Sequence, residues 1–519
     1  MMHIHDGGVP GRARTALIFA IHAALCAAVV CPWPAVAQVK DWPAEDPPRP
    51  LPARDVNFPP YEIRTLPNGM RVVVVMHHEQ PVVTLRLLLQ AGSVRDAPGK
   101  SGVAALAAAL LDQGTTTRSA EQIADTIDSI GGALGTGAGN DLSFANIVVM
   151  KDSLALGFDL LSDVVRNPAF KQEEIDRQRQ QAISALKVSF EDPDYVASVV
   201  FDRLVYGFHP YGMPGSGTPD SLQSITAADL HAHHQRYYAP NNAILAVVGD
   251  VTAQEAFAGT ERVFGNWAKR DVPPVPATEQ PVPTRRLVIV NRPGAVQTEI
   301  RAGHLGIRRE HKDYLAVDLA MKILGGEGSN RLHRVLRSER GLTYGAEASM
   351  QSLKQGGDFM ADTDTRTETT AEVLRVIVDE FQKLQRERVH ERELADAQAY
   401  LAGSFPLTIE TPDDIAAQVL NVLFYGLPLS EIESYRERVN AITVDDIQRV
   451  ARQYLRPDRL SVVLVGNAAA FTDTLKGVGF STFEVVDLSD LDLTAADFRR
   501  AAPPRPTTAS VPTPGADQK

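Results

Sequence analysis

The chain has 519 residues, a formal net charge of −12, and 44% hydrophobic and 22% charged residues. This length is typical of two to four domains, and the composition is that of an ordinary globular protein. The negative net charge gives no support to nucleic-acid binding, and no stretch after the N-terminus is apolar enough over a bilayer's width to predict a stable membrane span.

The first 37 residues have the layout of a secretory signal peptide. Arg12 and Arg14 supply positive charge, residues 15–30 form an apolar run, and Ala35-Val36-Ala37 matches the small-x-small cleavage pattern. A membrane anchor is the alternative, but the apolar run is short for one and ends before a proline. We therefore predict that residues 1–37 are removed and that the protein is periplasmic, in a bacterial envelope.

Both cysteines, Cys26 and Cys31, lie within this signal segment. The predicted mature chain therefore has no disulfide and no cysteine-ligated metal, which suits an oxidising periplasm. Residues 38–55 are rich in proline and charge and predict a leader without its own core. Residues 501–519 are rich in proline, alanine and threonine and predict a disordered tail.

The first predicted domain covers residues 56–270 and begins with strands. A Pro-Asn-Gly turn precedes a β-branched strand from Arg71, and a second strand covers 82–89. An alanine-rich segment from Gly102 to Thr115 predicts one short buried helix. Further helices are predicted over 119–130, 152–165 and 171–188, with a strand over 141–149.

An internal repeat indicates a second domain of the same kind. ITAADLHAHHQRYYAPNNAILAVVGD begins at Ile225, and ITVDDIQRVARQYLRPDRLSVVLVGN begins at Ile442, an offset of 217 residues. Each copy predicts a helix, a Tyr-x-x-Pro stop and an alternating apolar strand ending in glycine. The period is too long for a solenoid. We therefore predict a second domain over 287–485, joined by a proline-rich linker over 271–286. Strands at both ends of each unit predict an α+β fold with helices on one face of a mainly antiparallel sheet.

The alanine-rich segment resembles the zinc-binding segment of the pitrilysin/insulinase family of peptidases. That family carries an inverted motif, H-x-x-E-H, between Gly-Val-Ala and Gly-Thr, and the same flanks occur here. The histidine positions hold Ala105 and Ala109, and the glutamate position holds Ala108. In the intact motif two histidines on one helix face bind zinc, and the glutamate activates the metal-bound water.

Alanine offers no lone pair to a metal but favours a helix, so we expect a core helix without the metal site. The family's third ligand is a glutamate whose expected positions fall on Ser184 and Ala185, so this ligand is missing as well.

A second match to the family lies between Ser329 and Ser349. The pattern predicts a helix, a break at Gly341 and a following strand. Family members have an arginine and a tyrosine seven residues apart here, as Arg337 and Tyr344 are. The resemblance implies that this pair binds the substrate backbone and stabilises an oxyanion, which suits a guanidinium and a phenol. Without the resemblance, Arg337 would be a solvated cation and Tyr344 a core residue of the strand.

Two other segments carry residues that could form binding sites. His231 and His234 would share one helix face and could bind a metal, but no carboxylate accompanies them. The repeat has no histidine there, and we expect His231, His233 and His234 to form a solvent-facing polar surface. The glycine-rich segment 325–328 lacks the lysine of a phosphate-binding loop and predicts a connecting loop, with a weak substrate contact left open.

The resemblance covers residues 55 to 480 and implies two domains forming a half-clamp around a cavity. Related enzymes pair a chain carrying the zinc helix with a chain carrying the Arg/Tyr pair. The sequence thus predicts the non-catalytic, substrate-binding subunit of a heterodimeric zinc metallopeptidase, inactive alone and without metal or cofactor of its own. Its partner would be an HxxEH-bearing paralogue that holds the zinc, and its substrate a peptide. Two alternatives stay open: a periplasmic peptide-binding or scaffolding protein without a catalytic partner, and an active peptidase with an unrecognised site.

Overall fold

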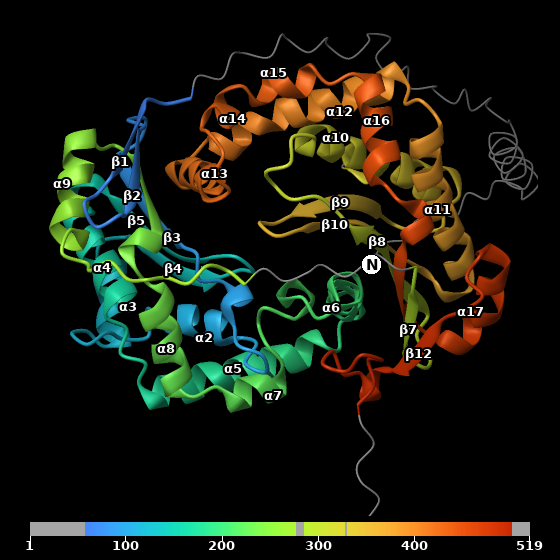
Figure 1. The fold of residues 1–519 in the computed structure, drawn as a ribbon, viewed down its shortest axis with the longest axis horizontal. Coiled ribbons are helices and arrows are strands. Elements are labelled where there is room, and N and C mark those ends of the chain that lie inside the picture. The colour runs from blue at the N-terminus through green and yellow to red at the C-terminus, as the bar shows by residue number, and fades with distance from the viewer. Residues whose placement is uncertain (1–57, 277–284, 327–329, 501–519) are drawn as a thin grey trace, which may run out of the picture. The chain divides into compact units, whose positions relative to one another are not determined.

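The computed structural model describes residues 58–276, 285–326 and 330–500. The predicted signal peptide, leader and tail, and much of the predicted linker, lie outside these residues. Two six-stranded sheets with helices packed on them form the described part of the chain (Figure 1). Within that part, no helix has the length and apolar character needed to cross a membrane.

The first sheet has the strand order β1-β2-β6-β3-β5-β4. Its strands are β1 (Tyr61–Thr65), β2 (Arg71–Met76), β3 (Val82–Leu89), β4 (Ala133–Ala138), β5 (Ser143–Met150) and β6 (Ala243–Gly249). Strands β2 and β6 pair in parallel, and the other four pairings are antiparallel. The mainly antiparallel sheet is therefore confirmed. Strand β4, ALGTGA, was not predicted, because its glycines and alanines give no strand signal.

The second sheet has the order β12-β7-β11-β8-β10-β9. Its strands are β7 (Leu287–Asn291), β8 (Gln297–Leu305), β9 (Ala346–Ser352), β10 (Gly357–Arg366), β11 (Ser461–Gly466) and β12 (Glu484–Asp487). Strand β7 pairs in parallel with β11 and β12, and the other pairings are antiparallel. The inner order β7-β11-β8-β10-β9 reproduces β2-β6-β3-β5-β4, which confirms two domains of one fold.

The helices complete each copy of the fold. They are α2 (Val103–Ala109), α3 (Ala120–Ser129), α4 (Leu154–Arg166), α5 (Gln172–Ser189), α6 (Pro193–Tyr206), α7 (Pro219–Ser224), α8 (Ala227–Tyr237), α9 (Ala253–Phe264), α10 (Tyr314–Gly325), α11 (Thr370–Arg386), α12 (Glu391–Ser404), α13 (Pro412–Phe424), α14 (Ser430–Glu433), α15 (Tyr435–Asn440), α16 (Val444–Tyr454) and α17 (Ala468–Leu475). Helices α8 and α16 begin and end at positions that match across the repeat. Each begins with a capping box, made by Thr226 with Asp229 and by Thr443 with Asp446.

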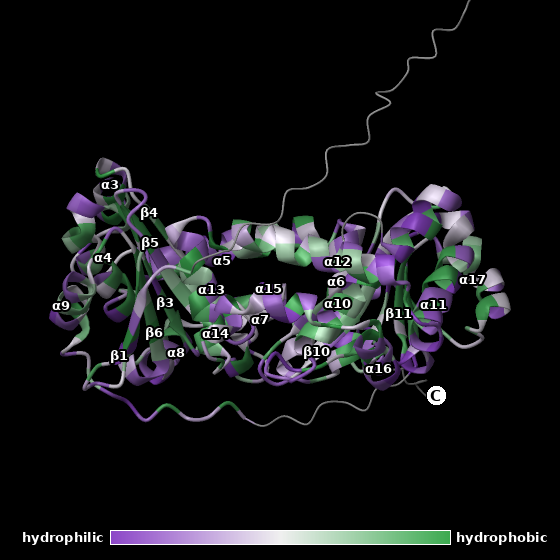
Figure 2. Ribbon diagram, turned by 90° about the horizontal axis from the view of Figure 1, so that it is seen from above, coloured by the Kyte–Doolittle hydropathy of each residue, from purple (hydrophilic) through white to green (hydrophobic). Residues whose placement is uncertain are grey.

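The central strands of each sheet are buried on both faces, so the prediction of helices on one face was incomplete. In β2, Val72 and Val74 pack in the core with α4 and α9, whereas Val73 and Val75 pack with α13. Every residue of β6 and of β11 is buried, so the predicted alternation in these strands was wrong. Their continuous apolar runs are the signal of strands covered on both sides. Figure 2 shows hydrophobic residues along β3, β6 and α13.

The two copies exchange one helix each. Helix α6, from the first half of the chain, packs on β8 and β11 of the second sheet. Helix α13, from the second half, packs on β3 and β6 of the first sheet. As a result, the described residues of both copies form one compact unit. The domain boundaries drawn from the sequence stay predictions.

Candidate functional site

Helix α2 forms within the alanine-rich segment but covers only Val103–Ala109, which is shorter than the helix predicted over Gly102 to Thr115. Gly102 precedes it with a φ of +98°, and Gly114 follows it with a φ of +112°. These left-handed conformations favour glycine, which explains why both glycines are present although the metal-binding residues are not. The Asp96 carboxylate accepts hydrogen bonds from the Gly102 and Ala104 amides at 2.8 and 2.9 Å and so fixes the start of the helix.

The positions expected to bind zinc carry no metal ligand. Ala105 and Ala109 are half-buried, one helical turn apart, and Ala108 is fully buried. Helix α5 packs against α2 but bears Ser184 and Ala185, both exposed, where the third ligand would stand. Among the described residues, no group of three or more His, Cys, Asp or Glu side chains is placed to hold a metal ion. The donor set of this segment therefore does not fit zinc.

Arg337 and Tyr344 do meet in the structure. The Arg337 guanidinium carbon lies 4.5 Å from the centre of the Tyr344 ring, a cation–π contact. Tyr344 is 80% exposed, which rules out the alternative of a core residue, and Arg337 is exposed too. No hydrogen bond, ion pair or ring contact in the described parts of the chain links this pair to α2.

A π-helical segment, His333–Glu339, presents Arg337. Arg337 Nη1 lies 3.2 Å from Nε2 of His333, so the imidazole nitrogen accepts a hydrogen bond from the guanidinium. At the start of the segment, Asn330 Oδ1 accepts a hydrogen bond from the His333 amide at 2.8 Å. Arg331 is buried and binds Glu393 of α12 through two hydrogen bonds of 2.9 and 2.8 Å. His333 was not predicted as a site residue, although its position four residues before Arg337 places the two side chains on one helix face.

The histidine cluster of α8 lies differently from its prediction. His231 is exposed, but His233 and His234 are buried, so a solvent-facing surface was wrong for these two. His233 Nε2 lies 3.2 Å from the Ala91 carbonyl oxygen and His234 Nε2 lies 2.8 Å from that of Val165, so each ring donates a hydrogen bond to backbone. Burial lowers the pKa of each imidazole to about 4, which keeps both neutral.

We expect His234→Ala to lower the free energy of unfolding by about 1–3 kcal/mol, because the buried Val165 carbonyl would lose its partner. Urea unfolding at pH 7 measures this loss. Gln235→Ala, an exposed change on the same helix, is the matched control and should stay within about 0.5 kcal/mol of the parent. Equal midpoints for the two variants would contradict the structural role of His234.

The chain is similar to known protein families and solved structures. The family model described as Insulinase (Peptidase family M16) matches residues 71–208, and the one described as Peptidase M16 inactive domain matches residues 224–401. A crystal structure of a peptidase M16 inactive domain from Pseudomonas fluorescens is 30% identical, with a TM-score of 0.74 over 78% of this chain and 98% of that chain. The chain belongs to the peptidase M16, or insulinase, family.

Relatives of this M16 chain include proteins named as zinc proteases. One, named an uncharacterized zinc protease of Mycobacterium tuberculosis, is 28% identical over 395 residues, 75% of this chain and 90% of the relative. Zinc protease PqqE of Helicobacter pylori is 24% identical over 414 residues, 79% of this chain and 93% of the relative. The predicted family is thus confirmed, whereas the assignment of the three alanines to its zinc-motif positions stays a prediction.

Proposed function

We propose that this chain is the non-catalytic, substrate-binding subunit of a heterodimeric zinc metallopeptidase. Its partner would be a paralogous M16 chain with an intact H-x-x-E-H motif. The proposal rests on a contrast within one chain. Helix α2 is present but holds alanines at the positions predicted to bind zinc, whereas Arg337 and Tyr344 are both present, in contact and exposed. The match to an inactive-domain model supports a partner only in general terms.

The chemistry of the pair suits a peptide substrate. A guanidinium and a phenol are both hydrogen-bond donors, and together they can bind a peptide carbonyl and the negative oxygen that develops from it. Stacking on Tyr344 limits the orientations of the Arg337 side chain before substrate arrives. A π-helical segment is rare and is often found at functional sites. The zinc and the water it activates would be supplied by the partner chain.

We further propose that the subunit works in the periplasm. This rests on the sequence alone, because the positive, apolar and small-x-small regions of residues 1–37 lie outside the described residues. The other candidate function is a periplasmic peptide-binding or scaffolding protein with no catalytic partner. The lack of a metal donor set in the described residues agrees with it equally well.

Assembly separates these two functions. We expect the mature chain mixed with the HxxEH-bearing M16 paralogue of the same organism to form a one-to-one complex, measured by light scattering after size-exclusion chromatography. The control is the same measurement on each chain alone. A mixture that elutes as two separate species would contradict the paired-subunit proposal and favour the scaffolding function.

A further inference from the structure

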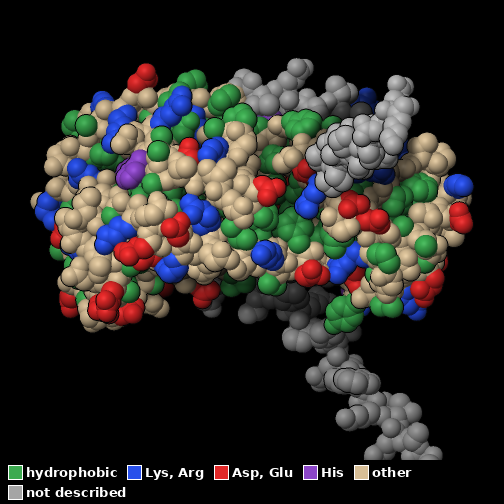
Figure 3. Space-filling view, turned by 90° about the horizontal axis from the view of Figure 1, so that it is seen from below, with side chains coloured by type: hydrophobic (Ala, Val, Ile, Leu, Met, Phe, Trp, Pro, Cys, Tyr) green, Lys and Arg blue, Asp and Glu red, His purple; other side chains and the backbone are tan. Residues whose placement is uncertain are grey.

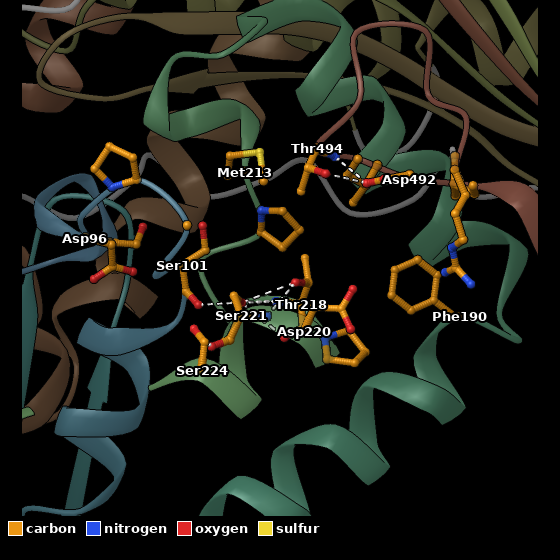
Figure 4. A pocket seen from close by; sticks show the side chains of 18 of the residues that line it. Asp96, Ser101, Phe190, Met213, Thr218, Asp220, Ser221, Ser224, Asp492 and Thr494 are labelled. Carbon is orange, nitrogen blue, oxygen red and sulfur yellow. Dashed lines mark hydrogen bonds between the residues drawn. The ribbon is translucent and has the colours of Figure 1, made fainter. Parts of the chain in front are cut away.

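A cavity of about 990 Å³ lies apart from the Arg337–Tyr344 pair and has no role in the function proposed above. It opens to solvent and is lined by the loop before α2, the end of α5, the segment around α7, and the segment that follows β12. Its size is at the upper end of sites that hold small ligands or a few peptide residues. Figure 4 shows Asp96, Asp220 and Asp492 reaching it from three different segments.

The cavity wall is largely apolar. Phe190, Phe208, Met213 and Leu491 are among the residues that line it. The Phe208 side chain is 64% exposed, an unusual amount for a ring that borders an apolar cavity. Figure 3 shows the molecule from below, the side on which α5 and α7 lie in Figure 1. Hydrophobic side chains gather in the middle of this face, with acidic and basic groups around them.

The charges around this apolar wall are mainly negative. Glu191, Asp220 and Asp492 line the cavity, and none of them has an ion-pair partner among the described residues. Arg500 lines it as the opposing charge. Asp96 also lines it, but it is committed to the start of α2, and burial raises its pKa to about 7. Carboxylates beside an apolar, partly desolvated wall favour a cation carried on an apolar stem.

The wall is held in place by α6. The buried Arg203 of this helix donates a hydrogen bond from Nε to the Leu493 carbonyl at 2.9 Å, and its guanidinium lies 3.7 Å from the centre of the Phe208 ring. One side chain thereby fixes two sides of the cavity. At the other side, Ser221 Oγ donates to the Ser101 carbonyl at 2.8 Å (Figure 4). The site is pre-formed, which reduces the entropic cost of binding.

We propose that this cavity binds a short peptide segment in which lysine or arginine stands among apolar residues. The rings and methionine would contact the apolar side chains, and the carboxylates of Glu191, Asp220 and Asp492 would bind the cation. Ser224 and Thr494 also line the cavity, and their hydroxyl hydrogens are donated to the Ser221 carbonyl and to Asp492, so each hydroxyl oxygen can accept a hydrogen bond from a peptide amide. A free diamine carries the same kind of cation but has no peptide backbone, so it can separate the contribution of the cation from that of the backbone. The site is in this chain alone, so the inference does not depend on the proposed partner.

Fluorescence anisotropy of the mature full chain tests this inference. The probe is a labelled short leucine–lysine peptide, and its leucine–glutamate counterpart is the charge control. We expect the lysine peptide to bind about tenfold tighter or more, with an affinity that falls as salt rises. Glu191→Gln combined with Asp220→Asn should weaken binding about tenfold, and Ser489→Trp, which fills the cavity from an exposed lining position, should abolish it. Asp473→Asn, an exposed change on α17, should leave the affinity unchanged.

Several results would overturn the inference. These are equal affinity for the two peptides, no measurable binding, or the same affinity in the cavity variants as in Asp473→Asn. Displacement of the probe by cadaverine at the concentration of the unlabelled peptide would show that the backbone contributes nothing and would exclude a peptide. A tenfold gain in affinity from Arg505→Glu would show that the chain's own residues after Arg500 are the occupant. The binding measurement uses the single chain without a partner. A failure to form the heterodimer would therefore not affect its result.

Discussion

Arg337→Ala is expected to lower kcat/KM of the mixed peptidase about 10²- to 10³-fold, the usual effect of removing one oxyanion donor. Tyr344→Phe removes the phenol donor but keeps the stacked ring, and it should act in the same direction. Both side chains are exposed and neither fills a core, so the free energy of unfolding should change by less than about 0.5 kcal/mol. Steady-state kinetics of the mixture and urea unfolding of the single chain measure the two effects.

Arg334→Ala is the matched control for Arg337→Ala. Arg334 belongs to the same π-helical segment, is exposed, and lies 3.8 Å from Glu339 in a surface ion pair. It should leave both kinetics and complex formation unchanged. If Arg337→Ala disrupted the complex, or if both arginine variants lowered turnover equally, the pair would have an assembly role instead of a substrate-binding role.

The free energy of unfolding is expected to depend on pH through helix α6, the helix that the first copy of the fold contributes to the second sheet. Helix α6 faces the second sheet with several ionisable groups. Tyr206 Oη donates to the Asp358 carboxylate at 2.7 Å, and Arg301, 7% exposed at its side chain, contacts Asp194 of α6 and Asp362 of β10. Burial and the nearby Asp358 raise the pKa of Asp202 to about 8. Burial, with Asp364 close by, raises the pKa of Glu299 to about 7, and burial raises that of Asp358 to about 6.

The sign of the pH effect follows from these raised values. Between pH 6.5 and 8 the folded state holds protons on Asp202, Glu299 and Asp96 that the unfolded chain has already released, so stability falls as pH rises. Buried histidines act oppositely, because the lowered pKa of His233, His234 and His304 makes stability fall as pH drops below about 6.5. Above pH 6.5 the raised pKa values of the buried acidic groups therefore determine how the free energy of unfolding changes with pH.

We therefore expect the free energy of unfolding to fall by about 1–3 kcal/mol between pH 6.5 and 8, since one pKa unit corresponds to about 1.4 kcal/mol. Urea midpoints at the two pH values measure this change. Asp202→Asn should flatten the dependence and raise the midpoint at pH 8, whereas the exposed Asp473→Asn should follow the parent chain. A parent midpoint that is constant or rises over this range would contradict the account.

Local signals in the sequence predicted much of the fold. Ser119 was predicted to start a helix and is the N-cap of α3, and the repeated Ile-Thr-x-x-Asp pattern became two matching capping boxes. The exchange of α6 and α13 could not be predicted, because an apolar helix face does not show which sheet it covers. The continuous apolar runs of β6 and β11 were a usable signal that helices cover both faces of these strands, but they were interpreted as alternating strands covered on one face.

The candidate site, like the fold, could be predicted from the sequence only in part. The spacing of Arg337 and Tyr344 predicted a related pair, and the structure stacks them, but a seven-residue spacing cannot show that Tyr344 stands exposed. For His233 and His234, the partners are backbone carbonyls of Ala91 and Val165, far away in the sequence. Polar side chains with distant backbone partners look like surface residues until the fold is known.

The most direct test of the central claim is to measure zinc content and peptidase activity of the mature chain, alone and mixed with the HxxEH-bearing M16 paralogue. The account predicts no bound zinc and no activity in the single chain, with chelator-sensitive cleavage of peptides appearing in the mixture. Stoichiometric zinc and chelator-sensitive cleavage by the single chain would contradict it.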